Sequence, residues 1–111
     1  MAETRDLDEP RYTISVVARL VNVHPQTLRN YEENELVVPS RSPGNIRLYT
    51  ERDVLRLQKI VRMTTELGIN LAGVEVILNL TERVESLQAE VEDLQDRLRD
   101  LGFDQPDGPE P

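Results

Sequence analysis

Four polar residues in the first half of the chain have side chains that hydrogen-bond to base-pair edges, and their spacing places them on one side of a helix. They are Gln26, Arg29, Asn30 and Glu33. Glutamine and asparagine pair bidentately with adenine in the major groove, arginine prefers guanine or phosphate, and glutamate accepts from cytosine N4. The opposite side, which we expect to pack, carries Leu28, Tyr31 and Glu35. The pattern favours a helix that recognises DNA bases, but an amphipathic helix exposed to solvent has the same pattern. The neighbouring segments are therefore needed to distinguish the two interpretations.

A helix-turn-helix is predicted around this segment. Ser15 is placed to cap a short first helix, and Asn22 can adopt the left-handed conformation that ends it. His24 then lies where an N-cap belongs. Pro25 follows at the first helical position, where its missing N–H would have had no intrahelical partner. The second helix, which carries the four polar residues, is expected to run to about Asn34.

A two-stranded wing is predicted after this helix, in residues 37–49, VVPSRSPGNIRLY. Residues 42–45, which include Asn45, are typical turn formers and join two short strands. Arg41 and Arg47 flank the turn. A basic hairpin beside a helix-turn-helix is well placed to clamp phosphates or to enter a minor groove, whereas an ordinary exposed hairpin is the alternative.

A third helix is predicted from the capping-box pattern of Thr50 and Asp53. Its apolar positions keep helical spacing as far as Leu67, and Gly68 suits the C′ position. Asn70 can cap the next helix, whose first apolar residues should pack back on the domain. The other side of the third helix is basic, and it either lies along a phosphate strand or is simply solvated. The basic residues are Arg52, Arg56, Lys59 and Arg62.

A coiled-coil seam follows, because seven apolar residues recur at alternating steps of four and three. They are Leu80, Val84, Leu87, Val91, Leu94, Leu98 and Leu101. Together with Ile77 they form the predicted dimerisation surface. The helix either restarts at Asn79 or continues from Asn70. An antiparallel homodimer is favoured, because that arrangement sets Arg83 opposite Glu90 of the partner subunit, whereas the parallel pairing has no charge complementarity.

Charge is distributed unevenly along the chain, whose formal net charge is −8. The segment 10–62 contains nine basic and five acidic residues, whereas the segment 63–111 contains three basic and twelve acidic residues. The predicted DNA-binding region is therefore basic despite the acidic total. Cysteine is absent, which excludes disulfides and thiolate metal sites, and the first residues lack the apolar core of a signal peptide, so we expect a cytoplasmic protein.

The ordered motifs resemble those of the MerR family of transcription regulators. These are a helix-turn-helix, TLR-x-Y at residues 27–31, a wing ending in R-x-Y at residues 47–49, and a capped third helix. HPQTLR and GINLAG are similar to the heat-shock repressor branch, HspR. The resemblance implies that Gln26, Thr27 and Arg29 face DNA, that Tyr31 combines packing with a phosphate contact, and that Arg47 and Tyr49 anchor the wing. The candidate DNA contacts are Ser15, His24, Gln26, Thr27, Arg29, Asn30, Tyr31, Arg41, Asn45, Arg47 and Tyr49.

The expected fold class is mostly α, with a winged helix-turn-helix domain followed by a long C-terminal dimerisation helix. We expect disorder in residues 1–11, the DNA-binding domain in 12–78, the coiled coil in 79–101 and a disordered tail in 102–111, which leaves no room for an effector domain. No catalytic, cofactor or metal site is predicted, because His24 is the only histidine and no phosphate-binding loop is present.

Three functions follow from these features. The resemblance implies a dimeric repressor of chaperone genes that binds an inverted repeat, with the chaperone DnaK as corepressor. Such a protein would be cytoplasmic and associated with the bacterial nucleoid, with no membrane partner. Another MerR-type regulator, such as a nitrogen-control repressor, is the first alternative. A coiled-coil adaptor that uses its globular head to bind protein is the second. The confinement of basic charge to helix and wing favours the DNA-binding functions over the adaptor.

Overall fold

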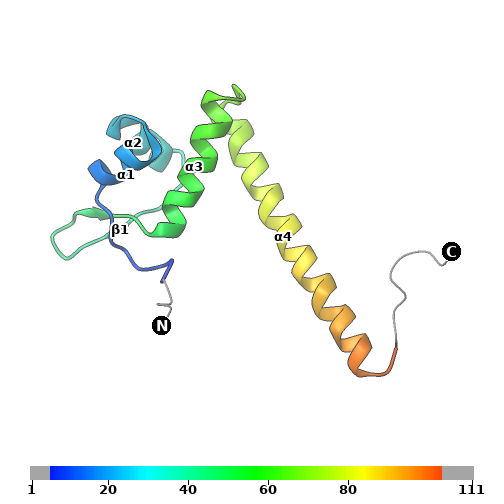
Figure 1. Ribbon diagram of the computed structural model, residues 1–111. Helices are drawn as coiled ribbons and strands as arrows, with labels where there is room; N and C mark the ends of the chain where they lie inside the picture. Colours follow the sequence, from blue (N-terminus) through cyan, green and yellow to red (C-terminus); the bar gives the residue numbers. More distant parts are fainter. Residues whose placement is uncertain (1–5, 104–111) are drawn as a thin grey trace. The chain divides into compact units, whose positions relative to one another are not determined.

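The computed structural model describes residues 6–103 of the chain, in which four helices and a two-stranded hairpin follow one another (Figure 1). The order is α1 (Ile14–Val21), α2 (Pro25–Glu33), β1 (Ser40–Arg41), β2 (Arg47–Leu48), α3 (Glu51–Thr65) and α4 (Leu71–Asp100). The described residues divide into two compact units after Glu75. The predicted fold class, mostly α with a small wing and a long C-terminal helix, is confirmed.

The turn between α1 and α2 follows from Asn22, which adopts φ 60° and ends α1 as predicted. Its neighbour Val23 donates its N–H to the carbonyl of Ala18 at 2.9 Å. The predicted cap of α1 is wrong, however. Thr13 is the N-cap residue, and Ser15 lies inside the first turn with its hydroxyl 3.3 Å from that of Thr13.

The end of α2 also differs from the prediction. The helix ends at Glu33, and Glu35 adopts φ 61° in an exposed position instead of packing on the apolar side. The left-handed residue turns the chain so that Leu36 donates its N–H to the carbonyl of Tyr31 at 3.0 Å. Leu36 is thereby buried beside the helix, which is how such C-terminal motifs bring the chain back onto the core.

The wing is a short antiparallel hairpin in which Ser40 pairs with Leu48 and Arg41 with Arg47. Its turn forms as predicted, because Asn45 adopts φ 65° and donates its N–H to the carbonyl of Ser42 at 2.8 Å. The second strand leads directly to the capping box of α3, where Thr50 Oγ1 accepts from the N–H of Asp53, and Asp53 Oδ2 accepts from the N–H of Thr50.

Residues 6–12 join the wing and the start of α3, although the sequence predicts disorder as far as residue 11. Tyr12 forms an isolated antiparallel bridge with Tyr49. The carbonyl of Leu7 accepts from the N–H of Arg52 at 3.0 Å, and Asp8 accepts from the guanidinium of Arg52 at 2.8 Å. Residues 1–5 of the expected disordered segment lie outside the described residues.

The core of the first unit is apolar and lies where α1 packs against α2 and α3. Its buried residues are Val17, Ala18, Val21, Leu28, Tyr31, Leu36, Val37, Tyr49, Val54, Leu57, Ile60 and Val74. Leu67, predicted to continue the apolar side of α3, is 65% exposed because the helix ends at Thr65 and Gly68 turns the chain with φ 66°.

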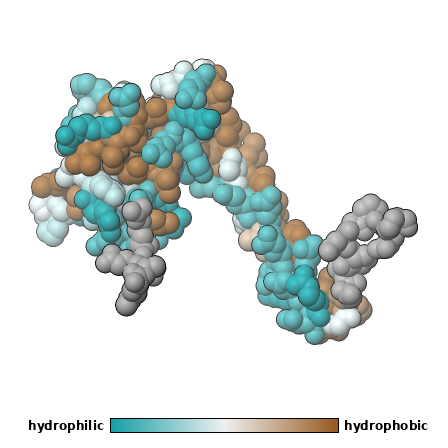
Figure 2. All heavy atoms as spheres, viewed as in Figure 1, coloured by the Kyte–Doolittle hydropathy of each residue, from teal (hydrophilic) through white to brown (hydrophobic). Residues whose placement is uncertain are grey.

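The fourth helix is continuous from Leu71 to Asp100, so it does not restart at Asn79. Asn70 caps it as predicted, with Oδ1 accepting from the N–H of Gly73 at 2.8 Å. In Figure 2, hydrophobic residues line one edge of this helix, and the side toward the viewer is mostly hydrophilic. The seven seam residues are 39–73% exposed, Ile77 is 37% exposed and Leu78 is buried.

Helix α4 ends at Asp100, and the chain then turns at Gly102, which adopts φ 90°. Phe103 donates its N–H to the carbonyl of Leu98 at 2.9 Å. The remainder of the predicted tail, residues 104–111, lies outside the described residues. None of the helices within residues 6–103 combines the length and apolar character that crossing a bilayer requires.

Candidate nucleic-acid interface

The start of α2 is organised by His24, which caps the helix as predicted. Its Nδ1 accepts from the N–H of Gln26 at 3.0 Å, and its carbonyl accepts from the N–H of Thr27 at 2.9 Å. Because Nδ1 is an acceptor, the neutral imidazole carries its proton on Nε2. The exposed ring therefore offers one N–H donor at the positive end of the helix dipole, where a DNA phosphate is favoured.

The exposed face of α2 carries the two amide side chains that could read adenine. Gln26 Nε2 donates to Asn30 Oδ1 at 3.3 Å, so the two side chains are joined across one helical turn. Both residues are exposed, whereas Thr27 and Arg29 are half-buried. On the predicted packing side Leu28 and Tyr31 are buried, whereas Glu35 is exposed.

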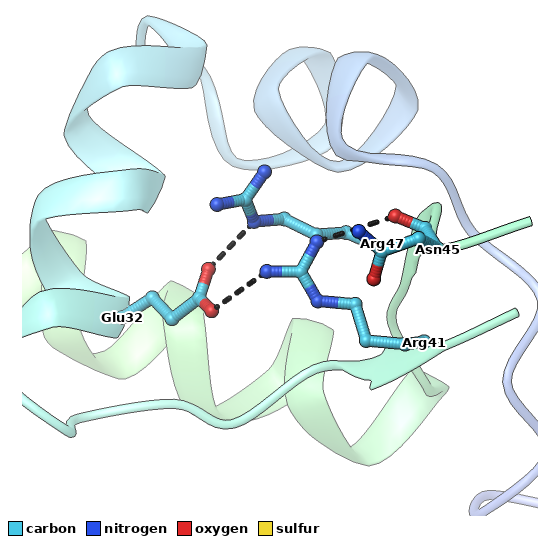
Figure 3. A network of polar contacts seen from close by, with 4 residues as sticks. All are labelled: Glu32, Arg41, Asn45 and Arg47. Atoms are coloured by element: carbon cyan, nitrogen blue, oxygen red, sulfur yellow. Dashed lines mark hydrogen bonds and ion pairs between the residues drawn. The ribbon is translucent and has the colours of Figure 1, made fainter.

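The wing arginines are joined to α2 by Glu32, a residue that the sequence reasoning missed (Figure 3). Arg47 Nε lies 2.6 Å from Glu32 Oε1, and Arg41 Nη2 lies 3.4 Å from Glu32 Oε2. Arg41 also donates to the carbonyl of Asn45 at 3.4 Å. The hydrogen bond with Glu32 raises the pKa of Arg47, whose guanidinium is charged at neutral pH in any case. A signal was available, because two arginines paired across a hairpin call for a nearby carboxylate.

Two tyrosines among the candidate DNA contacts are core residues. Tyr49 is 0% exposed, and its hydroxyl has no hydrogen-bond partner within residues 6–103. Burial raises the pKa of this phenol. Tyr31 is also buried, with its hydroxyl 3.4 Å from that of Thr64. Both rings are packed in the core of the first unit, and a phosphate contact of either hydroxyl stays a prediction.

The basic side of α3 is largely engaged with protein groups. Arg52 binds Asp8, and Arg62 binds Glu66 at 3.2 Å. Arg56 donates to the carbonyl of Leu36 at 2.6 Å, which ties α3 to the segment after α2. Only the Arg56 contact is part-buried, whereas Arg52 and Arg62 form exposed ion pairs, which contribute little to stability.

A metal site is not indicated in the described part of the chain, because residues 6–103 contain no cluster of three or more potential His, Asp or Glu ligands. What residues 24–49 bring together is a capped helix end, two exposed amides and a pair of charged guanidinium groups. Donors of these kinds bind base edges and phosphates.

Comparison with known proteins identifies this arrangement. Residues 12–81 match the model of the MerR HTH family of regulatory proteins. The heat shock protein HspR of Streptomyces coelicolor is 44% identical over 87 residues, which cover 78% of this chain and 58% of that protein. The regulator GlnR of Bacillus cereus is 36% identical over 73 residues, which cover 66% of this chain and 56% of that protein. The chain thus spans little more than half the length of these two relatives.

Solved structures agree with the fold. PbrR691 from Ralstonia metallidurans CH34, in complex with lead(II), superposes with a TM-score of 0.59 at 30% identity, covering 83% of this chain and 80% of that chain. HiNmlR, a MerR family regulator lacking the sensor domain and bound to promoter DNA, superposes with a TM-score of 0.57 at 19% identity, covering 82% of this chain and 75% of that chain. At this identity the comparison shows likeness of fold alone. The family model and these likenesses are those of transcription regulators, not of enzymes, and the chain belongs to the MerR family of helix-turn-helix regulatory proteins.

Proposed function

We propose that this MerR-family protein is a dimeric repressor of heat-shock genes that binds an inverted-repeat operator. The observation that carries the DNA-binding part is the exposed face of α2, where Gln26 and Asn30 present amides beside the charged wing. The likeness to HspR supports the heat-shock assignment. Glutamine and asparagine discriminate adenine from other bases, so α2 is the proposed recognition helix.

The dimer is proposed from the apolar seam of α4. Seven seam residues are exposed in the single chain, and an exposed seam of this length is stabilised by a partner helix. In the proposed antiparallel register Val84 layers on the partner's Leu87, and Arg83 lies opposite the partner's Glu90. Two recognition helices related by a two-fold axis would match the two halves of an inverted repeat.

Chaperone control is the finer part of the proposal. The DnaK chaperone would act as corepressor, with repression taking place on DNA in the cytoplasm. A nitrogen-control function is the second candidate, favoured by the 36% identity to GlnR. The coiled-coil adaptor is the outcome to which a failure of DNA binding would point.

Mapping the bound sites across the source genome tests the regulated genes. Enrichment of chaperone promoters is the expected result, and enrichment of nitrogen-metabolism promoters would favour the second candidate instead. Fluorescence anisotropy on a recovered site tests binding itself. If each dimer neutralises roughly 6–10 phosphates, the affinity should fall by about 10³–10⁵ between about 50 and 200 mM salt. Equal, weak binding to every duplex would contradict sequence-specific recognition.

A further inference from the structure

Glu32 lies at the junction of the two DNA-binding elements. It belongs to α2, two residues after Asn30, and its carboxylate accepts from both wing arginines. Arg41 and Arg47 are direct cross-strand partners, an arrangement in which like charges repel. A carboxylate shared between them offsets that repulsion and also fixes the wing against the recognition helix.

The two arginines are held unequally. Arg47 donates through Nε at 2.6 Å, a short charge-assisted bond, whereas both polar contacts of Arg41 measure 3.4 Å, near the outer limit of hydrogen bonding. A guanidinium has five N–H donors, and Glu32 takes only the Nε donor of Arg47. Figure 3 draws the contact of Arg47 with Glu32 from Nε alone, with no contact between Glu32 and either terminal nitrogen of Arg47. The side chain of Arg47 is 27% exposed and that of Arg41 is 40% exposed.

We propose that Glu32 is a positioning residue for DNA recognition, a role that rests on the proposed function. It holds Arg47 in a fixed orientation, with its terminal N–H groups available to one phosphate. It also neutralises Arg41 until a second phosphate replaces the carboxylate as the partner of that guanidinium. Arginine pairs with phosphate and carboxylate through the same fork of donors, so this exchange requires no other rearrangement of the side chain.

This arrangement raises specificity. On an unrelated duplex, phosphates must compete with Glu32 for Arg41, and no matching base contacts from α2 offset the lost ion pair. On the operator, Gln26 and Asn30 make their base contacts at the same time, and the wing is already in position. Glu32 therefore lowers affinity for unrelated DNA and raises affinity for the operator.

The experiment uses the full chain, an operator selected from a random duplex pool, and an unrelated duplex of equal length. Dissociation constants are measured by anisotropy for wild type, Glu32→Gln, Glu32→Asp and Glu35→Gln. Glu35 is the matched control because it is exposed, lies three residues away and carries the same charge. Glu32→Gln should weaken operator binding about tenfold and leave unrelated binding equal or tighter, so that the specificity ratio falls, whereas Glu35→Gln should preserve the ratio.

Glu32→Asp separates position from charge. Aspartate keeps the negative charge but is one methylene shorter, so binding to the unrelated duplex should stay as weak as in wild type while operator binding recovers only in part. An unchanged specificity ratio in Glu32→Gln, or an equal loss on both duplexes, would mean that Glu32 has no role beyond folding and would overturn the proposal. A wild-type protein with no preference for any sequence would instead contradict the proposed function itself.

A second pair of variants leaves Glu32 in place and does not depend on the stability of its substitutions. Arg47→Lys keeps the charge but lacks Nε and the planar fork, so operator affinity should fall strongly. Arg41→Lys should reduce operator affinity less, because the guanidinium of Arg41 is only loosely held before DNA binds. Equal losses in the two variants would contradict the unequal roles assigned to the two arginines.

Discussion

The side-chain amide of Gln26 donates to the side-chain carbonyl of Asn30, 3.3 Å away on the next turn of α2. This hydrogen bond restricts both side chains before DNA arrives. Binding then orders fewer rotatable bonds, which lowers the entropic cost of making base contacts. The two residues should therefore act as one unit in recognition.

Gln26→Ala and Asn30→Ala should each relax base preference, by roughly 1–3 kcal/mol at the contacted base pair. Because the two side chains are hydrogen-bonded to each other, the double variant should lose less base preference than the sum of the losses in the two single variants. Anisotropy on a panel of single-base operator variants measures both effects. Arg47→Ala is the comparison, since loss of a phosphate contact should weaken all members of the panel evenly. A changed preference in Arg47→Ala with none in the α2 variants would reverse the assignment of reading and anchoring.

Stability should decrease at alkaline pH through Tyr49. Burial raises the pKa of its phenol above the ordinary value of about 10, so the folded protein retains a proton that the unfolded chain releases. The contribution of the neutral Tyr49 phenol to the free energy of unfolding is complete below about pH 10, and it is lost as pH rises through the higher pKa of the folded state. Chemical denaturation between pH 8 and 11 should show this decline in wild type and in Tyr12→Phe, and a smaller decline in Tyr49→Phe. The same slope in all three proteins would rule out Tyr49 as its source.

Replacing Glu35 with asparagine should stabilise the protein. Glu35 adopts φ 61°, a conformation that is costly for residues with a long side chain and that asparagine tolerates best after glycine. The expected gain in the free energy of unfolding is about 0.5–1 kcal/mol, measured by denaturation in urea. Glu33→Asn serves as the control, since Glu33 lies within α2 and asparagine is a weaker helix former there. A loss of stability in Glu35→Asn would show that the strain is absent.

Single cysteines should reveal the orientation of the dimer. In the proposed antiparallel register, in which Val84 layers on the partner's Leu87, the two-fold axis passes between residues 85 and 86. Residue 84 therefore lies close to its counterpart, and residue 101 lies far from its own. Val84→Cys should form a disulfide on oxidation, whereas Leu101→Cys should not. The chain has no native cysteine to interfere. Efficient crosslinking at both positions, read on a non-reducing gel, would indicate a parallel coiled coil.

The sequence by itself determined the features that depend on a few neighbouring residues. The left-handed Asn22, the His24 cap, the turn ending at Asn45 and the Thr50 capping box all formed where the pattern indicated. Each is a contact within five residues, so local conformational preference is sufficient to predict it. The apolar period of α4 was visible for the same reason. Ser15 failed as a cap because Thr13 is also a good N-cap residue, and spacing could not choose between them.

Only the tertiary structure decided which distant residues meet. Glu32 reaches Arg47 fifteen positions away, and Asp8 reaches Arg52 forty-four positions away. Tyr49 is fully buried because the bridge from Tyr12 and the wing close around it, although its position after Arg47 in the wing motif implied an anchoring contact. The geometry of such pairs depends on how helices and strands pack, which residue types and their spacing do not encode locally. The two wing arginines indicated the need for a carboxylate, but only the folded chain showed that Glu32 of α2 supplies it.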